Sequence, residues 1–266
     1  MKCAVLGSPI SHSLSPAMHR AAYATLGLGW TYGSFDVSEG ELASFVAQRS
    51  DWRGFSVTAP LKREATELAL TRDEVVKDLG VANTLVATGD GWAAHNTDVP
   101  GACSALRQVH RPPIETVRIV GAGATAASLA LAGKRLGASH VELRARDAQR
   151  AAGTATAIEQ LGLTVSVVDL NVAVTESVDL LVSTVPSDAL VDREHEFSSA
   201  AQVVFDAIYD PWPTPLMRSA QAQGRPLVTG LDLLAHQAVL QVTLMTGSVI
   251  DPQTLLDAAA QTLASR

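Results

Sequence analysis

The sequence predicts an α/β fold. Short apolar runs alternate with longer stretches rich in alanine and leucine, a pattern typical of strands connected by helices and therefore of a mostly parallel sheet. The chain has 266 residues, enough for one large or two modest domains. Hydrophobic residues make up 47% and charged residues 18%, a balance that excludes a disordered chain.

The N-terminal third alternates strand and helix patterns. Proline after Ser15 and the apolar spacing beyond it predict a helix that runs from Ser15 through Leu26. Glycines at the turn 88–91 permit positive φ and predict a hairpin. The elements expected here are strands at 2–6, 31–36 and 55–58, a helix at about 62–70, and hairpin strands at 82–87 and 91–94.

Two successive prolines, Pro112 and Pro113, interrupt this pattern. Because they cannot continue a helix, we place a domain boundary close to them. The stretches between most of the later strands have a helical pattern, and helical spacing also extends from Leu231 to the C-terminus. Strands are expected at 117–120, 141–143, 165–168, 180–184, 203–207 and 227–229. The predicted domains are residues 1–100, 101–230 and 231–266.

Charge and composition exclude several classes of partner. Lys and Arg total 20 against 27 Asp and Glu, so a net charge of −7 predicts no nucleic-acid partner and no anionic membrane surface. No apolar run approaches the roughly 18 residues of a membrane span. Cys3 and Cys103 form no disulfide framework and the start is too short for a signal peptide, so we expect a cytoplasmic protein. The histidines show no metal-ligand spacing, so no metal is expected, and both a monomer and a homodimer stay open.

A glycine-rich segment follows one of the later strands. Gly121, Gly123 and Ala126 fit a Gly-x-Gly-x-x-Gly/Ala fingerprint that closes a strand and opens an alanine-rich helix. Gly121 would allow the tight turn, Gly123 would let the backbone approach a pyrophosphate, and Ala126 would let helix and strand pack closely. The sequence therefore predicts a Rossmann-type dinucleotide domain, with a glycine turn that binds no ligand as the alternative.

The residues after the second strand of that domain indicate which dinucleotide binds. An acid there holds a ribose 2′-hydroxyl, whereas an arginine holds a 2′-phosphate. Arg146 and Arg150 lie just past the expected strand, and the planar guanidinium suits phosphate, so we expect NADP. Asp147 favours NAD instead, and two solvated surface arginines are a third possibility.

Hydroxyl and lysine side chains follow two strands of the N-terminal region. Ser13 and Ser15 come after the first strand, although Ser15 also fits a helix N-cap. Thr58 and Lys62 flank a strand-to-helix turn, where a lone lysine is more often solvated than catalytic. A dinucleotide domain needs neither cluster.

A third cluster combines amide, hydroxyl and carboxylate groups. Asp98 closes the run Asn96-Thr97-Asp98, and Asn83 lies thirteen residues before Asn96. The structural alternative is that Thr97 or Asp98 caps a helix that begins near Pro100.

In this order and ahead of a dinucleotide fingerprint, the clusters resemble the shikimate dehydrogenase family. The resemblance spans nearly the whole chain and continues through residues 183–186, 208–215 and 230–238. It implies a substrate domain, completed by C-terminal helices that return to it, and a parallel-sheet dinucleotide domain. It also implies reversible NADP-dependent reduction of 3-dehydroshikimate to shikimate, a step towards chorismate and the aromatic amino acids.

The resemblance implies a role for individual residues. Lys62 and Asp98 match the catalytic pair, in which the lysine would transfer the proton and the aspartate would orient it. Ser13 and Ser15 would contact the substrate carboxylate. The substrate hydroxyls would be held by Thr58, Asn83 and Gln237, with Tyr209 nearby. The residues implied to line the cofactor site are Gly121, Gly123, Ala124, Ala126, Arg146, Arg150, Thr184 and Gly230.

Some positions depart from the family pattern. Ser56 stands where asparagine is frequent, Ala124 where a third glycine is common, and Ala145-Arg146-Asp147 where Asn-Arg-Thr is usual. Quinate-using relatives often carry threonine at the position of Ser15, which favours shikimate here. The alternatives are an NAD-dependent quinate/shikimate dehydrogenase, a non-catalytic ligand sensor of the same fold, and a dehydrogenase for an unrelated carbonyl compound.

Overall fold

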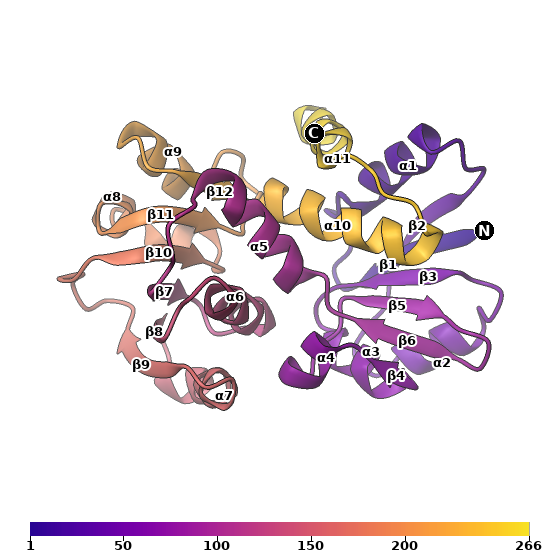
Figure 1. Ribbon diagram of the computed structural model, residues 1–266, viewed down its shortest axis with the longest axis horizontal. Coiled ribbons are helices and arrows are strands. Elements are labelled where there is room, and N and C mark those ends of the chain that lie inside the picture. The colour runs from indigo at the N-terminus through magenta and orange to yellow at the C-terminus, as the bar shows by residue number, and fades with distance from the viewer. Residues whose placement is uncertain (266) are drawn as a thin grey trace. The chain divides into compact units, whose positions relative to one another are not determined.

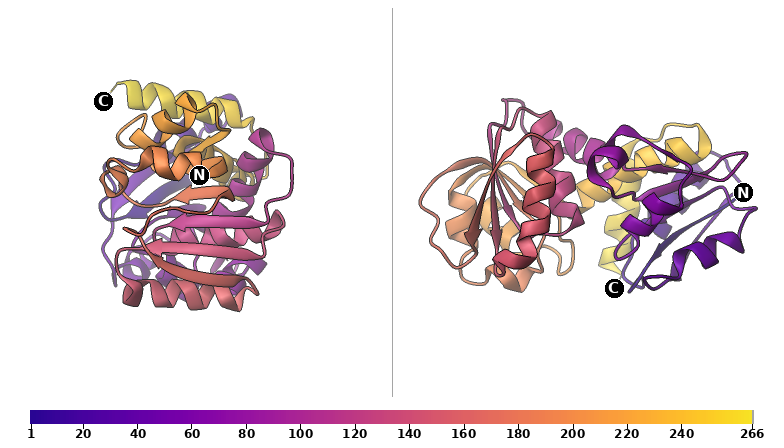
Figure 2. Two further views of the ribbon diagram at one scale, coloured as in Figure 1. Left: turned by 90° about the vertical axis from the view of Figure 1, so that its left-hand side faces the viewer. Right: turned by 90° about the horizontal axis from the view of Figure 1, so that it is seen from below.

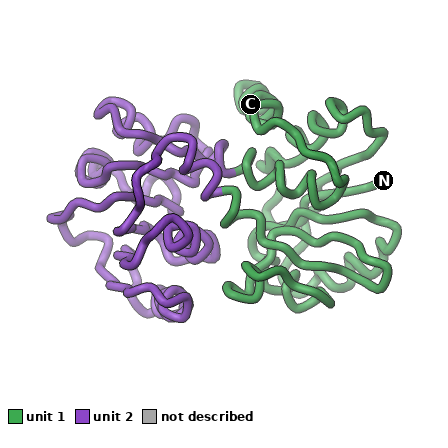
Figure 3. The backbone as a smooth tube through the Cα atoms, in the orientation of Figure 1, with its two compact units in different colours: residues 1–101, 234–266 green, residues 102–233 purple. Residues whose placement is uncertain are grey.

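The computed structural model describes residues 1–265, except for the side chain of Arg150. This part of the chain forms two compact units, which Figure 3 colours separately. Unit 1 comprises residues 1–101 and 234–266, and unit 2 comprises residues 102–233. The chain passes between them inside two helices, α5 (Asp98–Val109) and α10 (Gly230–Thr246). Pro112 and Pro113 follow the end of α5, so they end a helix within unit 2 instead of separating the units.

Unit 1 contains a six-stranded mixed sheet in the order β2-β1-β3-β5-β6-β4. β1 pairs in parallel with β2 and β3, and the predicted hairpin is confirmed because β5 and β6 are antiparallel neighbours. The strands are β1 (Lys2–Gly7), β2 (Thr31–Asp36), β3 (Gly54–Val57), β4 (Thr71–Arg72), β5 (Thr84–Ala87) and β6 (Trp92–His95). The helices are α1 (Ser15–Thr25), α2 (Leu42–Ala47), α3 (Lys62–Leu68), α4 (Glu74–Leu79) and α11 (Pro252–Ala264), together with most of α10 (Figure 1).

The centre of this sheet is buried on both sides. Every residue of β3 is buried, and Leu6, Phe55, Leu61 and Leu85 are fully enclosed in one apolar cluster. The two short helices α2 and α4 were not expected from the sequence, because six residues are too few to show a helical period. The ends of α4 do carry a local signal: the Asp73 carboxylate accepts from Val76 N–H, and Gly80 ends the helix at φ +65°.

Unit 2 contains a six-stranded parallel sheet in the order β12-β11-β10-β7-β8-β9. The strands are β7 (Thr116–Val120), β8 (His140–Ala145), β9 (Thr164–Asp169), β10 (Val178–Ser183), β11 (Ala201–Asp206) and β12 (Leu227–Thr229). The helices are α6 (Ala124–Arg135), α7 (Ala148–Gln160), α8 (Glu194–Ser199) and α9 (Pro215–Ala222), with a 3₁₀ turn η1 at Ser187–Leu190. All six strands predicted for this region are present, and the α/β fold class is confirmed.

The strand order of unit 2 reverses direction between β7 and β10. Right-handed crossovers then place α6 and α7 on one face of the sheet and α8 and α9 on the other, as Figure 2 shows. In such sheets, ligands bind at the carboxyl ends of the strands where the order reverses. No helix within residues 1–265 combines the length and apolar character needed to cross a membrane.

Candidate active site

Two helix starts bring a lysine and an aspartate together in unit 1. Lys62 is the first residue of α3, after the turn that follows β3, and Asp98 is the first residue of α5. The Lys62 Nζ and Asp98 Oδ2 atoms are 2.6 Å apart, and the two side chains are only 13% and 11% exposed. The sequence placed these residues in separate clusters, and the fold makes them a largely buried ion pair.

Asn96 explains why the Asp98 carboxylate is available for this pair. The side-chain Oδ1 of Asn96 accepts from the N–H groups of Asp98 and Val99 at 3.0 and 3.3 Å. Asn96 therefore caps α5, which begins two residues before Pro100. The expectation that Thr97 or Asp98 serves as the cap is wrong, because the preceding asparagine meets that need.

A buried amide and hydroxyl network surrounds the carboxylate. Asn83 Nδ2 donates to Asp98 Oδ1 at 2.8 Å and to Thr97 Oγ1 at 2.9 Å, and it lies 3.3 Å from Gln237 Oε1. Gln237 comes from α10, and Gly101 lets α5 approach that helix, since a Cβ at Gly101 would lie 2.8 Å from Gln237 N. Residues 154 positions apart therefore share one site.

The serine pair lies at the start of α1, also in unit 1. The N-cap position belongs to Leu14, so the interpretation of Ser15 as the N-cap is wrong; Ser15 is the first helical residue and no described side chain caps this helix. The Ser13 hydroxyl lies 3.3 Å from the backbone N–H of Ser15. Both serines thus stand at a helix N-terminus, where backbone N–H groups favour an anion.

Thr58 lies where the ends of β1 and β3 approach each other. A Cβ at Gly7 would lie 2.4 Å from Thr58 Cγ2 and 2.9 Å from the Ala59 carbonyl oxygen, so the glycine permits this close approach. Ser8 N–H also bonds the Ala59 carbonyl at 3.1 Å. Thr58 and the segment that leads to Ser13 therefore lie together at the carboxyl ends of β1 and β3.

A second polar layer, not predicted from the sequence, lies beneath these residues. Gln241, 1% exposed, accepts from the Ser56 hydroxyl at 2.6 Å and donates to Thr84 Oγ1 at 2.9 Å and to the Asn83 carbonyl at 3.1 Å. His19 Nε2 lies 3.2 Å from Gln241 Oε1, and burial lowers the His19 pKa to about 4. Gln241 lies one helical turn after Gln237, and that i, i+4 spacing is the sequence signal that would have found it.

The Ser56 hydroxyl has a second partner in this layer. Tyr32 O–H donates to it, and burial raises the pKa of that phenol. Ser56 therefore has a donor, Tyr32, and an acceptor, Gln241, in this layer.

The glycine-rich turn of unit 2 connects β7 to α6 at the point where the strand order reverses. Gly121 adopts φ +111°, and a Cβ there would lie 2.3 Å from Thr184 Oγ1, so only glycine fits this position. Gly123 is the N-cap of α6, and no described atom lies within 4 Å of a Cβ built on it. Ala126 is fully buried against the sheet. The open space at Gly123 and the uncapped start of α6 at Ala124 fit a dinucleotide phosphate.

The arginines after β8 differ in role. Arg144 is buried and pairs with Glu142, so it is committed to the unit 2 core. Arg146, just past the strand, is exposed. The Asp147 carboxylate accepts from Gln149 N–H at 2.9 Å at the start of α7, and the Arg150 side chain lies outside the described residues.

Two more residues implied for the site belong to unit 2. Gly230 begins α10, and a Cβ on it would lie 2.6 Å from the Ala207 carbonyl oxygen, so it serves a close backbone approach. Tyr209 follows β11 and is half-buried. The structure thus places the proton-transfer and hydroxyl-binding candidates in unit 1 and the dinucleotide candidates in unit 2.

The chain is similar to known proteins over nearly its whole length. Residues 5–85 match the family model described as the shikimate dehydrogenase substrate binding domain. The shikimate dehydrogenase (NADP(+)) of Aeropyrum pernix is 33% identical over 96% of this chain and 95% of its own length. The crystal structure of Mycobacterium tuberculosis shikimate dehydrogenase is 34% identical, covers 98% of this chain and 99% of that one, and has a TM-score of 0.87.

A further solved relative carries both ligands. The Thermus thermophilus shikimate 5-dehydrogenase in complex with NADP(H) and shikimate is 30% identical, covers 99% of this chain and all of that one (100%), and has a TM-score of 0.84. Since these identities extend over nearly the full length of both chains, the chain belongs to the shikimate dehydrogenase family.

Proposed function

We propose that this protein catalyses the NADP-dependent interconversion of 3-dehydroshikimate and shikimate. The observation that carries the proposal is the buried Lys62–Asp98 pair, 2.6 Å apart, beside the amides of Asn83 and Gln237. The relatives bear the name shikimate dehydrogenase (NADP(+)), and the Thermus thermophilus relative holds NADP(H) and shikimate.

The hydrogen-bonding groups of unit 1 suit a ligand that brings hydroxyl donors. Asn83 Nδ2 has two hydrogens but three acceptors within reach: Thr97 Oγ1, Asp98 Oδ1 and Gln237 Oε1. Thr97 has one hydroxyl hydrogen and two acceptors, at 3.2 and 3.3 Å. This excess of acceptors favours a polyhydroxylated substrate, whose O–H groups supply the missing donors.

The substrate carboxylate is assigned to Ser13 and Ser15. They stand at the N-terminus of α1, an eleven-residue helix whose first turn holds no acidic residue. The positive end of the helix dipole and the uncapped N–H groups would stabilise a carboxylate, and the two hydroxyls would donate hydrogen bonds to it.

Lys62 performs the proton transfer in this mechanism. In reduction, its ammonium donates a hydrogen bond to the carbonyl oxygen and then gives that oxygen a proton; in oxidation, the neutral amine takes the hydroxyl proton. Asp98 holds the Nζ atom in place by its 2.6 Å contact. NADP, when bound, accepts the hydride in oxidation and its reduced form supplies it in reduction.

Arg146 favours NADP over NAD, and the contact that Asp147 makes weakens the case for NAD. Arg146 is exposed at the carboxyl end of β8, where a 2′-phosphate would lie. The Asp147 carboxylate serves the start of α7, which makes it a poorer partner for a free 2′-hydroxyl. We place the protein in the cytoplasm, which is consistent with the buried thiols of Cys3 and Cys103, neither of which forms a disulfide.

Initial rates with shikimate and with quinate, each against NADP and NAD, test this function. We expect a strong preference for shikimate with NADP. Lys62→Ala should lower kcat by roughly 10²- to 10⁴-fold with a much smaller effect on substrate affinity. Lys77→Ala, which removes an exposed lysine on α4, is the matched control and should leave the rates unchanged.

Each other outcome has a definite meaning. Preference for NAD or for quinate would mean that the protein is an NAD-dependent quinate/shikimate dehydrogenase. Binding of shikimate without turnover would leave the ligand sensor, and near-normal turnover of Lys62→Ala would remove Lys62 from the mechanism.

A further inference from the structure

The last turns of α5 and α6 bring two arginines onto facing sides of one groove in unit 2. Cys103 of α5 packs on α6, with its Sγ 3.6 Å from the Ala132 carbonyl oxygen. Arg107 follows Cys103 by four residues and Arg135 follows Ala132 by three, so each arginine lies on the contacting face of its helix. Burial raises the pKa of the Cys103 thiol, and the positive charges of Arg107 and Arg135 act against that rise. Both guanidiniums therefore lie near the same thiol.

We call this groove the arginine groove and define it by Arg107, His110, Arg111 and Arg135, over a floor that includes Ile114 and Leu136. It has a volume of about 250 Å³, and no acidic residue lines it within the described part of the chain. Ile114 N–H bonds the Leu136 carbonyl at 3.2 Å, which fixes the loop after α5 to the end of α6. The floor is thus rigid and partly apolar, and the rim is cationic.

The arginines of the groove have no partner among the described residues. Arg107, Arg111 and Arg135 take part in no side-chain hydrogen bond or ion pair with residues 1–265. Asp179, beside the start of β7, already accepts from Glu115 N–H, Thr116 N–H, the Thr116 hydroxyl and the Gln202 amide. Its hydrogen bonds are therefore all made outside the groove, although its charge also interacts with His110.

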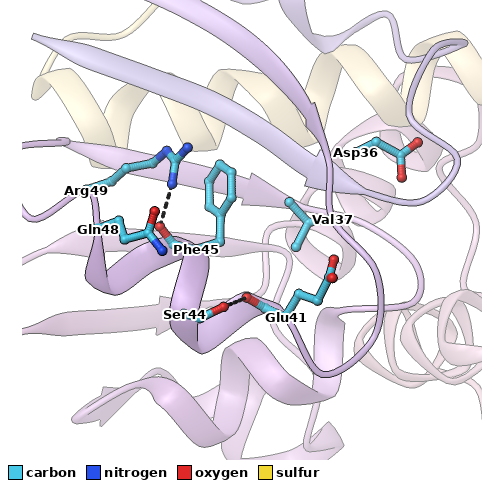
Figure 4. Close-up of a pocket in the computed structure, with 7 residues that line it drawn as sticks. All are labelled: Asp36, Val37, Glu41, Ser44, Phe45, Gln48 and Arg49. Atoms are coloured by element: carbon cyan, nitrogen blue, oxygen red, sulfur yellow. Dashed lines mark hydrogen bonds between the residues drawn. The ribbon is translucent and has the colours of Figure 1, made fainter.

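A hollow in unit 1 shows the contrasting case. Figure 4 shows Arg49 beside Phe45, in a hollow that Asp36 and Glu41 also line. The Arg49 guanidinium donates to the Phe45 carbonyl at 2.8 Å and lies 3.5 Å from the centre of the Phe45 ring. Arg49 therefore has a hydrogen-bond acceptor and acidic neighbours, whereas the three arginines of the groove form no ion pair within residues 1–265.

Helix dipoles account for only part of this charge. The C-terminal ends of α5 and α6 each carry roughly −0.5 of an elementary charge, about −1 together, against three guanidinium charges. His110 adds a polar group that needs a partner, because its Nε2 is buried and makes no hydrogen bond with the described residues. The Asp179 carboxylate, which interacts electrostatically with His110, offsets about one further charge, so the groove keeps an excess of about one positive charge and an unsatisfied ring nitrogen.

We propose that the arginine groove binds a small molecule that bears phosphate. Phosphate oxygens match the planar, bidentate geometry of arginine and would also accept from a His110 ring N–H. The apolar floor at Ile114 and Leu136 would contact an organic part of the ligand. The groove lies at the opposite end of α6 from Gly123, roughly 18 Å away for twelve helical residues, so it is separate from the dinucleotide turn.

Titration calorimetry with inorganic pyrophosphate, at low ionic strength and on the full chain, tests the proposal. Arg107→Gln/Arg135→Gln should weaken pyrophosphate binding by about tenfold or more, because two charge-assisted contacts are lost. Both side chains are exposed, so the variant should keep the wild-type circular dichroism spectrum and melting temperature. His110→Ala, at a third groove position, should weaken binding as well.

Two controls distinguish binding in the groove from binding elsewhere on the protein. Lys2→Gln/Lys77→Gln removes the same charge from exposed sites of unit 1, and Arg146→Gln removes the cation proposed for the 2′-phosphate. The lysine variant should bind pyrophosphate within about twofold of wild type, and Arg146→Gln should keep the part of the binding that Arg107→Gln/Arg135→Gln removes. Equal weakening in the lysine control would mean that pyrophosphate binds through the general charge of the protein. Weakening in Arg146→Gln alone would mean that it binds at the dinucleotide site. Either result overturns the proposal.

Two further outcomes would also overturn it. One is a wild-type protein that binds no pyrophosphate at millimolar concentration. The other is tighter binding of citrate than of pyrophosphate at the groove, which would assign carboxylates and remove phosphate as the ligand.

Discussion

Replacement of Gln241 by leucine should destabilise unit 1 through its buried polar layer. In Gln241→Leu, the Ser56 hydroxyl loses its acceptor at 2.6 Å and His19 Nε2 loses its contact at 3.2 Å. The Asn83 carbonyl still accepts from Val57 N–H at 2.7 Å, and the Thr84 hydroxyl still donates to Asn83 Oδ1 at 2.8 Å. The Ser56 hydroxyl keeps Tyr32 O–H as a donor but loses the acceptor for its own hydrogen, and His19 Nε2 loses its contact, so two buried hydrogen-bonding positions are left unsatisfied.

The expected cost follows from that count. A buried unsatisfied group costs about 1–3 kcal/mol, which gives roughly 2–6 kcal/mol for two. The apolar surface of the new leucine offsets about 1 kcal/mol. We expect the free energy of unfolding of unit 1 to fall by about 1–5 kcal/mol.

Urea unfolding followed by tryptophan fluorescence measures this change. Trp30, Trp52 and Trp92 lie in unit 1 and only Trp212 lies in unit 2, so the signal reports mainly on the unit that changes. Gln253→Leu, at an exposed position of α11, is the matched control and should stay within about 0.5 kcal/mol of wild type.

A double-mutant cycle tests the cause. Ser56→Ala combined with Gln241→Leu should deviate from additivity by about 1 kcal/mol or more, since the two side chains share a hydrogen bond. A loss below about 1 kcal/mol for Gln241→Leu, or a fully additive cycle, would refute the argument that this layer stabilises the site.

Three further predictions concern pH, the glycine-rich turn and the unit 2 core. The His19 pKa falls from 6.5 to about 4 on folding, so below pH 6.5 the unfolded chain binds a proton that the folded chain does not. The free energy of unfolding should therefore decline as the pH falls from 6.5 to 4, by about 3 kcal/mol over 2.5 pH units. His19→Gln should show a flatter profile of unfolding free energy against pH. Gly121→Ala should lower the melting temperature because its φ is +111°, whereas Gly123→Ala, with φ −98° and open space, should fold normally and raise the KM for NADP; equal melting temperatures would contradict this assignment. Glu142→Gln leaves the buried Arg118 without its carboxylate and should destabilise unit 2 by about 3–5 kcal/mol in thermal unfolding, whereas Glu159→Gln on the exposed face of α7 should not.

Local patterns in the sequence were sufficient to predict the fold class and most strands. The six strands of unit 2 and the hairpin of unit 1 follow from short apolar runs and turn residues, which act over a few neighbouring positions. The turn at Gly121 and Gly123 was also readable, because its glycines, the strand before it and the helix after it are contiguous. The resemblance to a family added candidate residues that spacing alone did not connect.

Which of those residues meet depends on how distant segments pack in the folded chain. Helix α10 returns to unit 1 and places Gln237 beside Asn83, and Asn96 takes the capping role that leaves Asp98 for Lys62. The order of residues along the chain also does not show the buried layer of Tyr32, Ser56 and Gln241. Nor does it show that the arginines at the ends of α5 and α6 lack a partner within residues 1–265. Hydrogen bonds and burial depend on which atoms approach within a few ångströms, and local sequence patterns do not encode contacts between residues more than a hundred positions apart.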